Sequence, residues 1–208
     1  MRSFSFLVLL LVLSAPVCAI EPTDLGQGLI YLRINSLAKS AQDLRSALLR
    51  PNALVLDLRY TADEPAAADG LRELNSQPAK PNLYVLVSPA TPAAVAAILT
   101  TTATPLVTLG VKDSVPVAQV IIAQTPEADR SAYDALETGT ALASLIAGKI
   151  EKERFDEATL VHEFKNGNHD AHPPEADPAK PGASPAVLTD RVLQRAVHLH
   201  RALLALKR

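Results

Sequence analysis

The stretch Ala53-Leu54-Val55-Leu56-Asp57-Leu58-Arg59 decides the fold class of this chain. It is apolar at nearly every position before Arg59, which is typical of a strand that is buried on both faces. Similar apolar runs lie at residues 29–34 and 83–87, and a stretch with helical character separates each run from the next. Apolar strands that alternate with helices predict a largely parallel sheet covered by helices, so we expect an α/β core.

The other expected elements continue this alternation along the chain. The spacing of four apolar residues predicts an amphipathic helix over residues 37–49. Further helices are expected over residues 66–74, 92–102, 131–147 and 157–166, and further strands over residues 106–109 and 117–122. Thr91 is the expected N-cap of the helix over residues 92–102, with Pro92 at its first position.

Composition and charge exclude one class of partner. The 208 residues are 48% hydrophobic and 20% charged, which is ordinary for a globular protein. The formal net charge of −2 provides no field that would attract a polyphosphate. There is no Trp, and two of the four Phe, Phe4 and Phe6, lie in a segment that we expect to be removed. We therefore expect no nucleic-acid partner.

The first nineteen residues have the pattern of a secretory signal peptide. Arg2 precedes an apolar run over residues 6–13, and Pro16 and Ala19 supply the break and the small residue that signal peptidase recognises. This run is too short to cross a hydrocarbon core ~30 Å thick. We expect cleavage after Ala19, so that residues 1–19 are lost and the protein is secreted, in a bacterial periplasm, without stable membrane insertion.

An alternative for this segment is lipid anchoring through Cys18. That pathway favours a small residue directly before the cysteine, and Val17 is branched and bulky. Cys18 is the only cysteine, so cleavage after Ala19 leaves an exported protein without disulfides or thiol chemistry.

Composition also divides the rest of the chain. Residues 167–185 contain five prolines among polar residues, so we expect a flexible linker between a core over residues 20–166 and a C-terminal amphipathic helix over residues 186–208. The apolar face of that helix is expected to consist of Val192, Ala196, Leu199, Leu203 and Leu206. Its polar face is expected to consist of Arg191, Gln194, Arg195, His198 and Arg201.

Three motifs in this order resemble the core of the C-terminal processing, or tail-specific, serine peptidases. The run Leu56-Asp57-Leu58-Arg59 is similar to the family's L-D-L-R strand, and Tyr84-Val85-Leu86-Val87 to the V-L-V strand that leads to the catalytic serine. The run Asp190-Arg191-Val192-Leu193-Gln194-Arg195-Ala196 is similar to the family's D-x-x-L-Q-x-A helix. The resemblance covers nearly the whole expected mature chain, but the PDZ domain of most members is missing. It implies a crotonase- or ClpP-like superhelical α/β fold.

The catalytic residues that the resemblance implies are largely lost. Members of the family use a serine nucleophile at a helix N-terminus and a neutral lysine that takes its proton. The resemblance places the serine position on Ala93, whose methyl group cannot attack a carbonyl, and the lysine position on Lys112. The candidate substitute nucleophiles are Thr91 and Ser88, although Thr91 is also the expected helix cap.

The turn that would hold a developing oxyanion is altered as well. Residues 60–65 replace the family's N-x-G-G turn and contain no glycine that would let the backbone approach closely. Asp63 and Glu64 would repel an oxyanion. No catalytic residue is therefore expected.

The histidines offer a different candidate chemistry. His169 and His172 lie near Asp170, Glu175 and Asp177, but ordering the expected linker would oppose metal binding. His198 and His200 are two positions apart on a helix and point ~200° apart, so they cannot share a metal ion. We expect these histidines to be solvated or capping, and we expect no cofactor.

These observations lead to a main hypothesis and two alternatives. The main hypothesis is an exported, non-catalytic homologue of the tail-specific peptidases that binds an extended polypeptide, by strand addition beside residues 83–87, or that assembles with another subunit. The first alternative is an active serine-type endopeptidase that uses Ser88 or Thr91 with Lys112. The weaker alternative is periplasmic metal binding through the His-rich linker.

Overall fold

The computed structural model describes residues 22–64, 71–72, 74, 82–147 and 188–206. It contains one sheet with the strand order β1-β2-β3-β4-β5-β6. The strands are β1 (Thr23–Asp24), β2 (Leu29–Arg33), β3 (Ala53–Asp57), β4 (Leu83–Val87), β5 (Val107–Val111) and β6 (Val120–Ile122). β1 is antiparallel to β2, and all other neighbours are parallel. The expected α/β class with a largely parallel sheet is confirmed.

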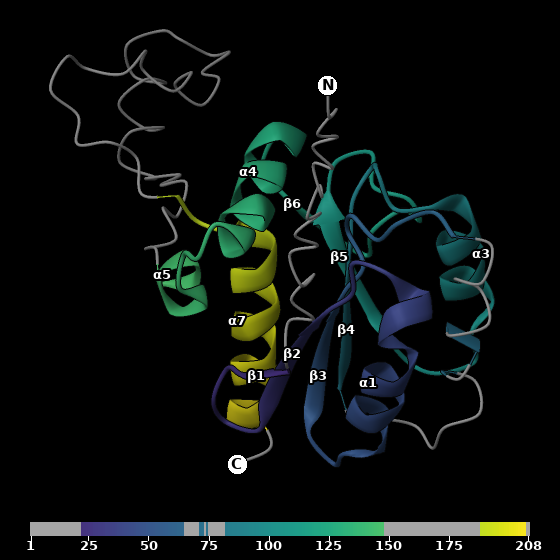
Figure 1. Ribbon diagram of the computed structural model, residues 1–208. Helices are drawn as coiled ribbons and strands as arrows, with labels where there is room; N and C mark the ends of the chain where they lie inside the picture. Colours follow the sequence, from purple (N-terminus) through teal and green to yellow (C-terminus); the bar gives the residue numbers. More distant parts are fainter. Residues whose placement is uncertain (1–21, 65–70, 73, 75–81, 148–187, 207–208) are drawn as a thin grey trace, which may run out of the picture.

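Helices cover both faces of this sheet (Figure 1). They are α1 (Leu37–Leu49), α3 (Ala93–Thr101), α4 (Pro126–Glu137), α5 (Leu142–Ile146) and α7 (Arg191–Leu206). Because parallel neighbours follow each other in chain order, right-handed crossovers place α1 and α3 on the same face. Figure 1 shows α4, α5 and α7 on the opposite face.

The residues that alternate along the strands divide into two apolar clusters. The first lies between the sheet and helices α1 and α3, and it includes Leu32, Leu54, Leu56, Val85 and Val87. The second, which we call the α7-side cluster, includes Tyr31, Val55, Tyr84, Leu86, Leu109, Val192, Leu193 and Ala196. β3 and β4 are buried along their whole length, which explains why their sequences are apolar on both faces.

Helix α1 begins and ends where the sequence predicts. Ser36 is its N-cap, and the Ser36 side chain accepts a hydrogen bond from the backbone N–H of Lys39. The carboxylate of Glu64 accepts a second hydrogen bond at this end, from the backbone N–H of Ala38 at 3.3 Å. A negative charge is favourable at a helix N-terminus, so Glu64 also stabilises α1 through the helix dipole.

Three features of the helices differ from the prediction. The N-cap of α3 is Pro92, without a side-chain cap hydrogen bond, so the assignment of Thr91 as N-cap is wrong. The single helix expected over residues 131–147 is two helices, α4 and α5. Gly139 separates them with a φ of +90°, which a glycine adopts without strain. α4 also begins earlier than expected because the Thr125 hydroxyl caps it and Pro126 occupies its first turn.

The C-terminal helix is confirmed, but its buried face is not the expected one. It begins at Arg191, and its buried residues are Val192, Leu193, Gln194, Ala196, Val197 and His200. Leu203 is 37% exposed and Leu206 is 83% exposed, so these two residues of the expected apolar face are not buried. Gln194 belongs to the buried side because its amide donates a hydrogen bond of 2.9 Å to the carbonyl oxygen of Ile146.

Several predictions fall outside the described residues. They are the signal peptide over residues 1–19, anchoring through Cys18, the linker over residues 167–185 with His169 and His172, and the helix over residues 157–166. Residues 71, 72 and 74, the described part of the helix expected over residues 66–74, are helical. Among the helices that the structure describes, none combines the length and the hydropathy that crossing a membrane requires.

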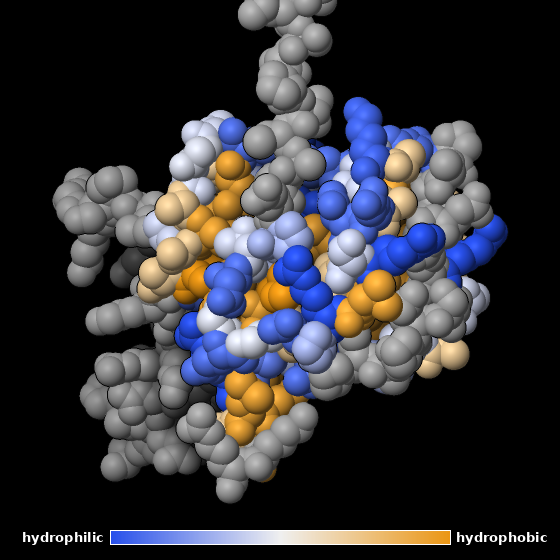
Figure 2. All heavy atoms as spheres, turned by 60° about the horizontal axis from the view of Figure 1, so that its bottom comes forward, coloured by the Kyte–Doolittle hydropathy of each residue, from blue (hydrophilic) through white to orange (hydrophobic). Residues whose placement is uncertain are grey.

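The end of the molecule that carries the amino ends of the parallel strands is chemically mixed. Figure 2 shows hydrophobic groups there separated by hydrophilic side chains over the visible surface. The ends of α1 and α7 lie on this side in Figure 1, where Leu49 is 65% exposed. Isolated apolar side chains of this kind are normal on a protein surface.

Candidate functional site

The carboxyl ends of the parallel strands bring together most of the residues singled out in the sequence. Asp57 ends β3 and is followed by Arg59, Ser88 follows the end of β4, and Lys112 follows the end of β5. Ligands and catalytic groups in open α/β sheets commonly lie at this edge.

Ser88 is buried, and its hydroxyl already has backbone partners. The Oγ donates a hydrogen bond to the carbonyl oxygen of Arg59 and accepts one from the backbone N–H of Ala90 at 3.1 Å. These bonds join the turn after β4 to the chain after β3. A hydroxyl that is 0% exposed and bonded in this way is not presented to a substrate.

Thr91 supports the same turn. Its Oγ1 accepts a hydrogen bond of 2.9 Å from the backbone N–H of Ser88 and lies 3.4 Å from the carbonyl oxygens of both Leu58 and Arg59. Thr91 is 5% exposed. Its hydroxyl therefore stabilises a backbone turn, which is a different role from the helix cap expected from the sequence.

Ala93 and Lys112, the positions that the resemblance assigned to the serine and the lysine, both lie on the surface. Ala93 is the first residue of α3 and is exposed, and Lys112 is exposed in the turn after β5. Two contacts hold this second turn beside the end of β4: the Ser114 hydroxyl is 3.3 Å from the carbonyl oxygen of Val87, and the Val115 N–H donates to the carbonyl oxygen of Ser88 at 3.1 Å.

The residues that replace the expected oxyanion turn hold the backbone in place. The Thr61 hydroxyl donates a hydrogen bond of 2.6 Å to the carbonyl oxygen of Ile34, and the Ala62 N–H donates one of 2.8 Å to that of Asn35. Glu64 accepts hydrogen bonds from the Ser36 hydroxyl and from the start of α1. These residues join the chain after β3 to the end of β2.

A buried ionic cluster dominates this edge of the sheet. It consists of Arg59 and three carboxylates, Asp57, Asp129 and Asp190, and all four side chains are 0% exposed. A guanidinium group has five N–H donors, and Arg59 uses all of them. Its Nε donates to Asp57, one terminal nitrogen donates to Asp129 and Asp190, and the other donates to Asp57 and Asp190.

The carboxylates of the cluster accept further hydrogen bonds. The Tyr31 hydroxyl donates to Asp57 at 2.8 Å, and the Tyr60 hydroxyl donates to Asp129 at 2.8 Å. Asp190 accepts a bond of 2.9 Å from the Leu193 N–H and so caps the start of α7. The cluster thereby joins β2, β3, α4 and α7.

The electrostatics of the cluster follow from burial and from its charge balance. Burial would lower the pKa of Arg59, but the neighbouring Asp190, Asp57 and Asp129 raise it well above its ordinary value. Burial raises the pKa of Asp129, and the favourable interaction with Arg59 only partly opposes this. One cation faces three carboxyl groups, so a neutral Asp129 brings the cluster closer to charge balance.

A second cation beside the cluster fastens α4 to the sheet. Arg33 lies with its guanidinium carbon 3.4 Å from the ring centroid of Tyr133 and donates to the Tyr133 carbonyl oxygen at 3.0 Å. It also forms an ion pair of 2.6 Å with Glu137. Burial is the main cause that raises the pKa of Tyr133 to about 12.

The two histidines of α7 have different surroundings. His198 is partly exposed, and burial together with Arg201 and Arg195 lowers its pKa. The histidines were expected to be solvated or capping, and His200, which is only 3% exposed, is not solvated. Its Nε2 lies 3.1 Å from the carbonyl oxygen of Gln27. Within the described ranges, no group of three potential ligands is arranged to hold a metal ion.

In the described structure the buried hydroxyls of Ser88 and Thr91 hold backbone turns, and Arg59 joins carboxylates from separate elements. The sequence motifs contain three members of the ionic cluster, Asp57, Arg59 and Asp190, but the sequence did not indicate that these residues meet. A signal was present, because a charged pair at the end of a fully apolar strand needs partners when it is buried. Asp129 carried no such signal in the sequence.

Comparisons with known proteins identify no relative. No protein-family model matches this chain, and no curated protein and no solved structure matches it.

Proposed function

We propose that this protein is an exported, non-catalytic relative of the tail-specific serine peptidases that binds a polypeptide or assembles with another subunit. The observation that carries the proposal is the state of the nucleophile position. Ala93 occupies the first position of α3, and the nearby hydroxyls of Ser88 and Thr91 are buried and hydrogen-bonded to backbone groups. A reacting serine needs an accessible oxygen next to a base.

The relation to this family is supported by contacts between its separate motifs. Asp57 and Arg59 come from the L-D-L-R run, and Asp190 opens the D-x-x-L-Q-x-A helix. Arg59 donates hydrogen bonds to both carboxylates. Two short motifs that meet in one buried cluster are harder to explain by chance than two motifs that lie apart.

The crotonase- or ClpP-like fold is part of the same proposal. It is supported by five strands that follow each other in parallel in chain order and by crossover helices that stack on one face. A fold does not by itself carry a function, so the proposal depends on the residues at the carboxyl edge.

A polypeptide would have to bind at a different strand from the one that the sequence suggested. β4 pairs with β3 on one side and with β5 on the other, so no strand can be added beside residues 83–87. The outer strands of the described sheet are β1 and β6. Strand addition therefore requires one of these edges.

The proposed setting is the periplasm, where the protein would meet extended or partly unfolded chains. Its proposed partners are an extended polypeptide or another protein subunit, and nucleic acid is not among them. The net charge of −2 supports the exclusion of nucleic acid.

A cleavage and labelling experiment tests the proposal. Purified protein is incubated with fluorescein-labelled casein, which lacks stable tertiary structure, and with a serine-directed fluorophosphonate. We expect casein to bind without being cut, and no covalent adduct in the intact mass. Cleavage that is abolished by Lys112→Ala, Ser88→Ala or Thr91→Ala would instead establish the active endopeptidase. Stoichiometric zinc that survives dialysis would favour the metal-binding alternative.

A further inference from the structure

β6 is an outer strand whose edge is available in the described part of the chain. It pairs with β5 in the register Leu109↔Val120, Gly110↔Ile121 and Val111↔Ile122, and no described strand lies on its other side. Outer strands present main-chain N–H and C=O groups that can pair with an added chain. β1, at the opposite edge, has only two residues.

The side chains of β6 do not protect this edge. Natural outer strands are commonly shielded by charged residues or proline, and β6 reads Val120-Ile121-Ile122. Val120 and Ile122 pack against the α7-side cluster. Because side chains alternate along a strand, Ile121 points to the face that carries α3, and it is 61% exposed.

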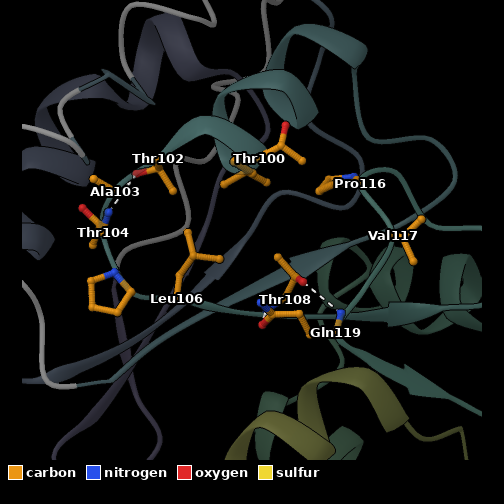
Figure 3. A pocket seen from close by; sticks show the side chains of 11 residues that line it. Thr100, Thr102, Ala103, Thr104, Leu106, Thr108, Pro116, Val117 and Gln119 are labelled. Carbon is orange, nitrogen blue, oxygen red and sulfur yellow. Dashed lines mark hydrogen bonds between the residues drawn. The ribbon is translucent and has the colours of Figure 1, made fainter.

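A pocket lies on the same face, next to β6. It has a volume of about 430 Å³ and opens between the end of α3, the start of β5 and the segment that leads into β6 (Figure 3). Figure 3 shows Pro116 and Val117 on one side of it and Thr102, Ala103 and Thr104 on the other. Val117 is 81% exposed, so the rim of the pocket carries an exposed apolar side chain.

The pocket and Ile121 lie at neighbouring positions along the sheet. Thr108, which lines the pocket, exchanges two hydrogen bonds with Gln119: the Gln119 N–H donates to its Oγ1 at 3.0 Å, and its own N–H donates to Gln119 Oε1 at 3.2 Å. Two residues further along β5, Gly110 pairs with Ile121. Gly110 has no side chain, and the side chain of Ser114 occupies the space beside it, which a larger residue would need.

The chemistry of the lining restricts what can occupy it. None of the lining residues is ionisable, and six of them are apolar or proline: Leu99, Ala103, Pro105, Leu106, Pro116 and Val117. The hydroxyls of Thr100 and Thr104 donate to backbone carbonyl oxygens. An uncharged side chain fits this lining better than a charged one, because a buried charge would have no partner.

From these observations we infer that the β6 edge and this pocket form one docking surface for an extended, uncharged segment of another polypeptide. The segment would add to β6 as a further strand, with alternate side chains over Ile121 and in the pocket. Main-chain hydrogen bonds would supply affinity, and the pocket would supply specificity. The inference deepens the proposed function and rests on it.

A second copy of this chain is a poorer occupant. Pairing β6 with β6 would join two strands of three residues each, whereas stable dimers bury ~1,200–2,000 Å² in total. An extended segment can use the edge and the pocket together.

Casein binding tests the docking surface with matched variants. The affinity of full-length purified protein for fluorescein-labelled casein is measured by fluorescence anisotropy for the unmodified protein, Ile121→Lys and Leu206→Lys. Both substituted side chains are largely exposed, so both variants should fold, which their thermal unfolding confirms. We expect at least about tenfold weaker binding for Ile121→Lys, because it places a charge on an apolar contact, and less than about twofold change for Leu206→Lys.

Hydrogen exchange locates the bound segment. Amides of residues 120–122 should exchange more slowly with casein bound, because an added strand pairs with this edge. Undiminished binding by Ile121→Lys, or protection confined to other elements, overturns the docking surface and leaves the proposed polypeptide binding intact. Absence of casein binding by the unmodified protein overturns both. A casein-free dimer that Ile121→Lys dissociates overturns the assignment to a foreign polypeptide.

Discussion

Asp190 and Arg59 are 131 positions apart in the chain and are joined by two hydrogen bonds, of 3.1 and 2.7 Å, in a fully buried ion pair. This pair fixes the start of α7 on the carboxyl edge of the sheet. Asp190 also caps α7, so one carboxylate orients the helix and completes the surroundings of a buried cation. The C-terminal helix is therefore an integral part of the core.

Removing the Asp190 carboxylate should destabilise the protein strongly. Asp190→Ala leaves Arg59 without two of its hydrogen bonds and leaves α7 without its cap, so we expect a loss of about 3–5 kcal/mol in the free energy of unfolding. Asp134→Ala breaks only the exposed pair with Arg130 and should cost about 0.5 kcal/mol or less. Urea unfolding followed by circular dichroism measures both. Equal losses of stability in the two variants would show that the ionic cluster is not the cause of the destabilisation.

The cluster should make stability depend on pH through Asp129. Burial raises the pKa of Asp129 in the folded protein, so the stabilising contribution of its neutral form is complete below the unfolded pKa of about 3.9. That contribution is lost as the pH rises through the folded pKa. Asp129→Asn stays neutral, so its urea midpoint should fall less between about pH 4 and pH 8 than that of the unmodified protein. Parallel pH profiles for the two proteins would contradict this account.

Two buried tyrosines on the same side of the sheet should respond differently to loss of the hydroxyl. Tyr31→Phe removes a hydrogen bond to the Asp57 carboxylate and should cost about 1.5–3 kcal/mol of stability. The Tyr84 hydroxyl is buried without a hydrogen-bond partner in the described structure, so Tyr84→Phe should be neutral within about 0.5 kcal/mol or stabilising. Thermal unfolding of the two variants compares them directly. A larger loss from Tyr84→Phe would indicate a partner for its hydroxyl.

The Ser88 hydroxyl should matter for stability and not for catalysis. Ser88→Ala leaves a buried backbone carbonyl and the Ala90 N–H without their side-chain partner, so we expect a loss of about 1–3 kcal/mol. Lys112→Ala alters an exposed turn and should stay within about 0.5 kcal/mol. Chemical denaturation measures both variants. A Ser88→Ala protein as stable as the unmodified one would mean that its hydrogen bonds are replaced after substitution.

Elements whose signals are local were predicted well from the sequence. The predicted bounds of α1 are correct, because the signals that set them, the Ser36 cap and the apolar spacing after it, lie within or next to the helix itself. β3 and β4 were likewise placed almost to the residue, because burial on both faces requires an unbroken apolar run. Gly139 ended α4 within a stretch that otherwise reads as helical, and the apolar spacing alone did not show this.

Features that depend on tertiary contacts were not predicted correctly. Thr91 is a good helix cap by residue type, but the Ser88 N–H lies within reach and takes its hydroxyl. His200 was expected to be solvated or capping, whereas packing in the folded protein leaves it only 3% exposed. The meeting of Arg59 with Asp129 and Asp190 joins segments far apart in sequence, and no periodicity encodes such a contact.

The late position of Asp190 has a consequence for the order of synthesis. A growing chain that has emerged as far as residue 150 already contains Arg59, Asp57 and Asp129 but still lacks the third carboxylate and the helix that closes the face of the sheet. Such a nascent chain cannot complete this core, because the apolar surface of β4 and β5 on this face stays uncovered until α7 has been made. The sheet can therefore pair its strands before it can close this face.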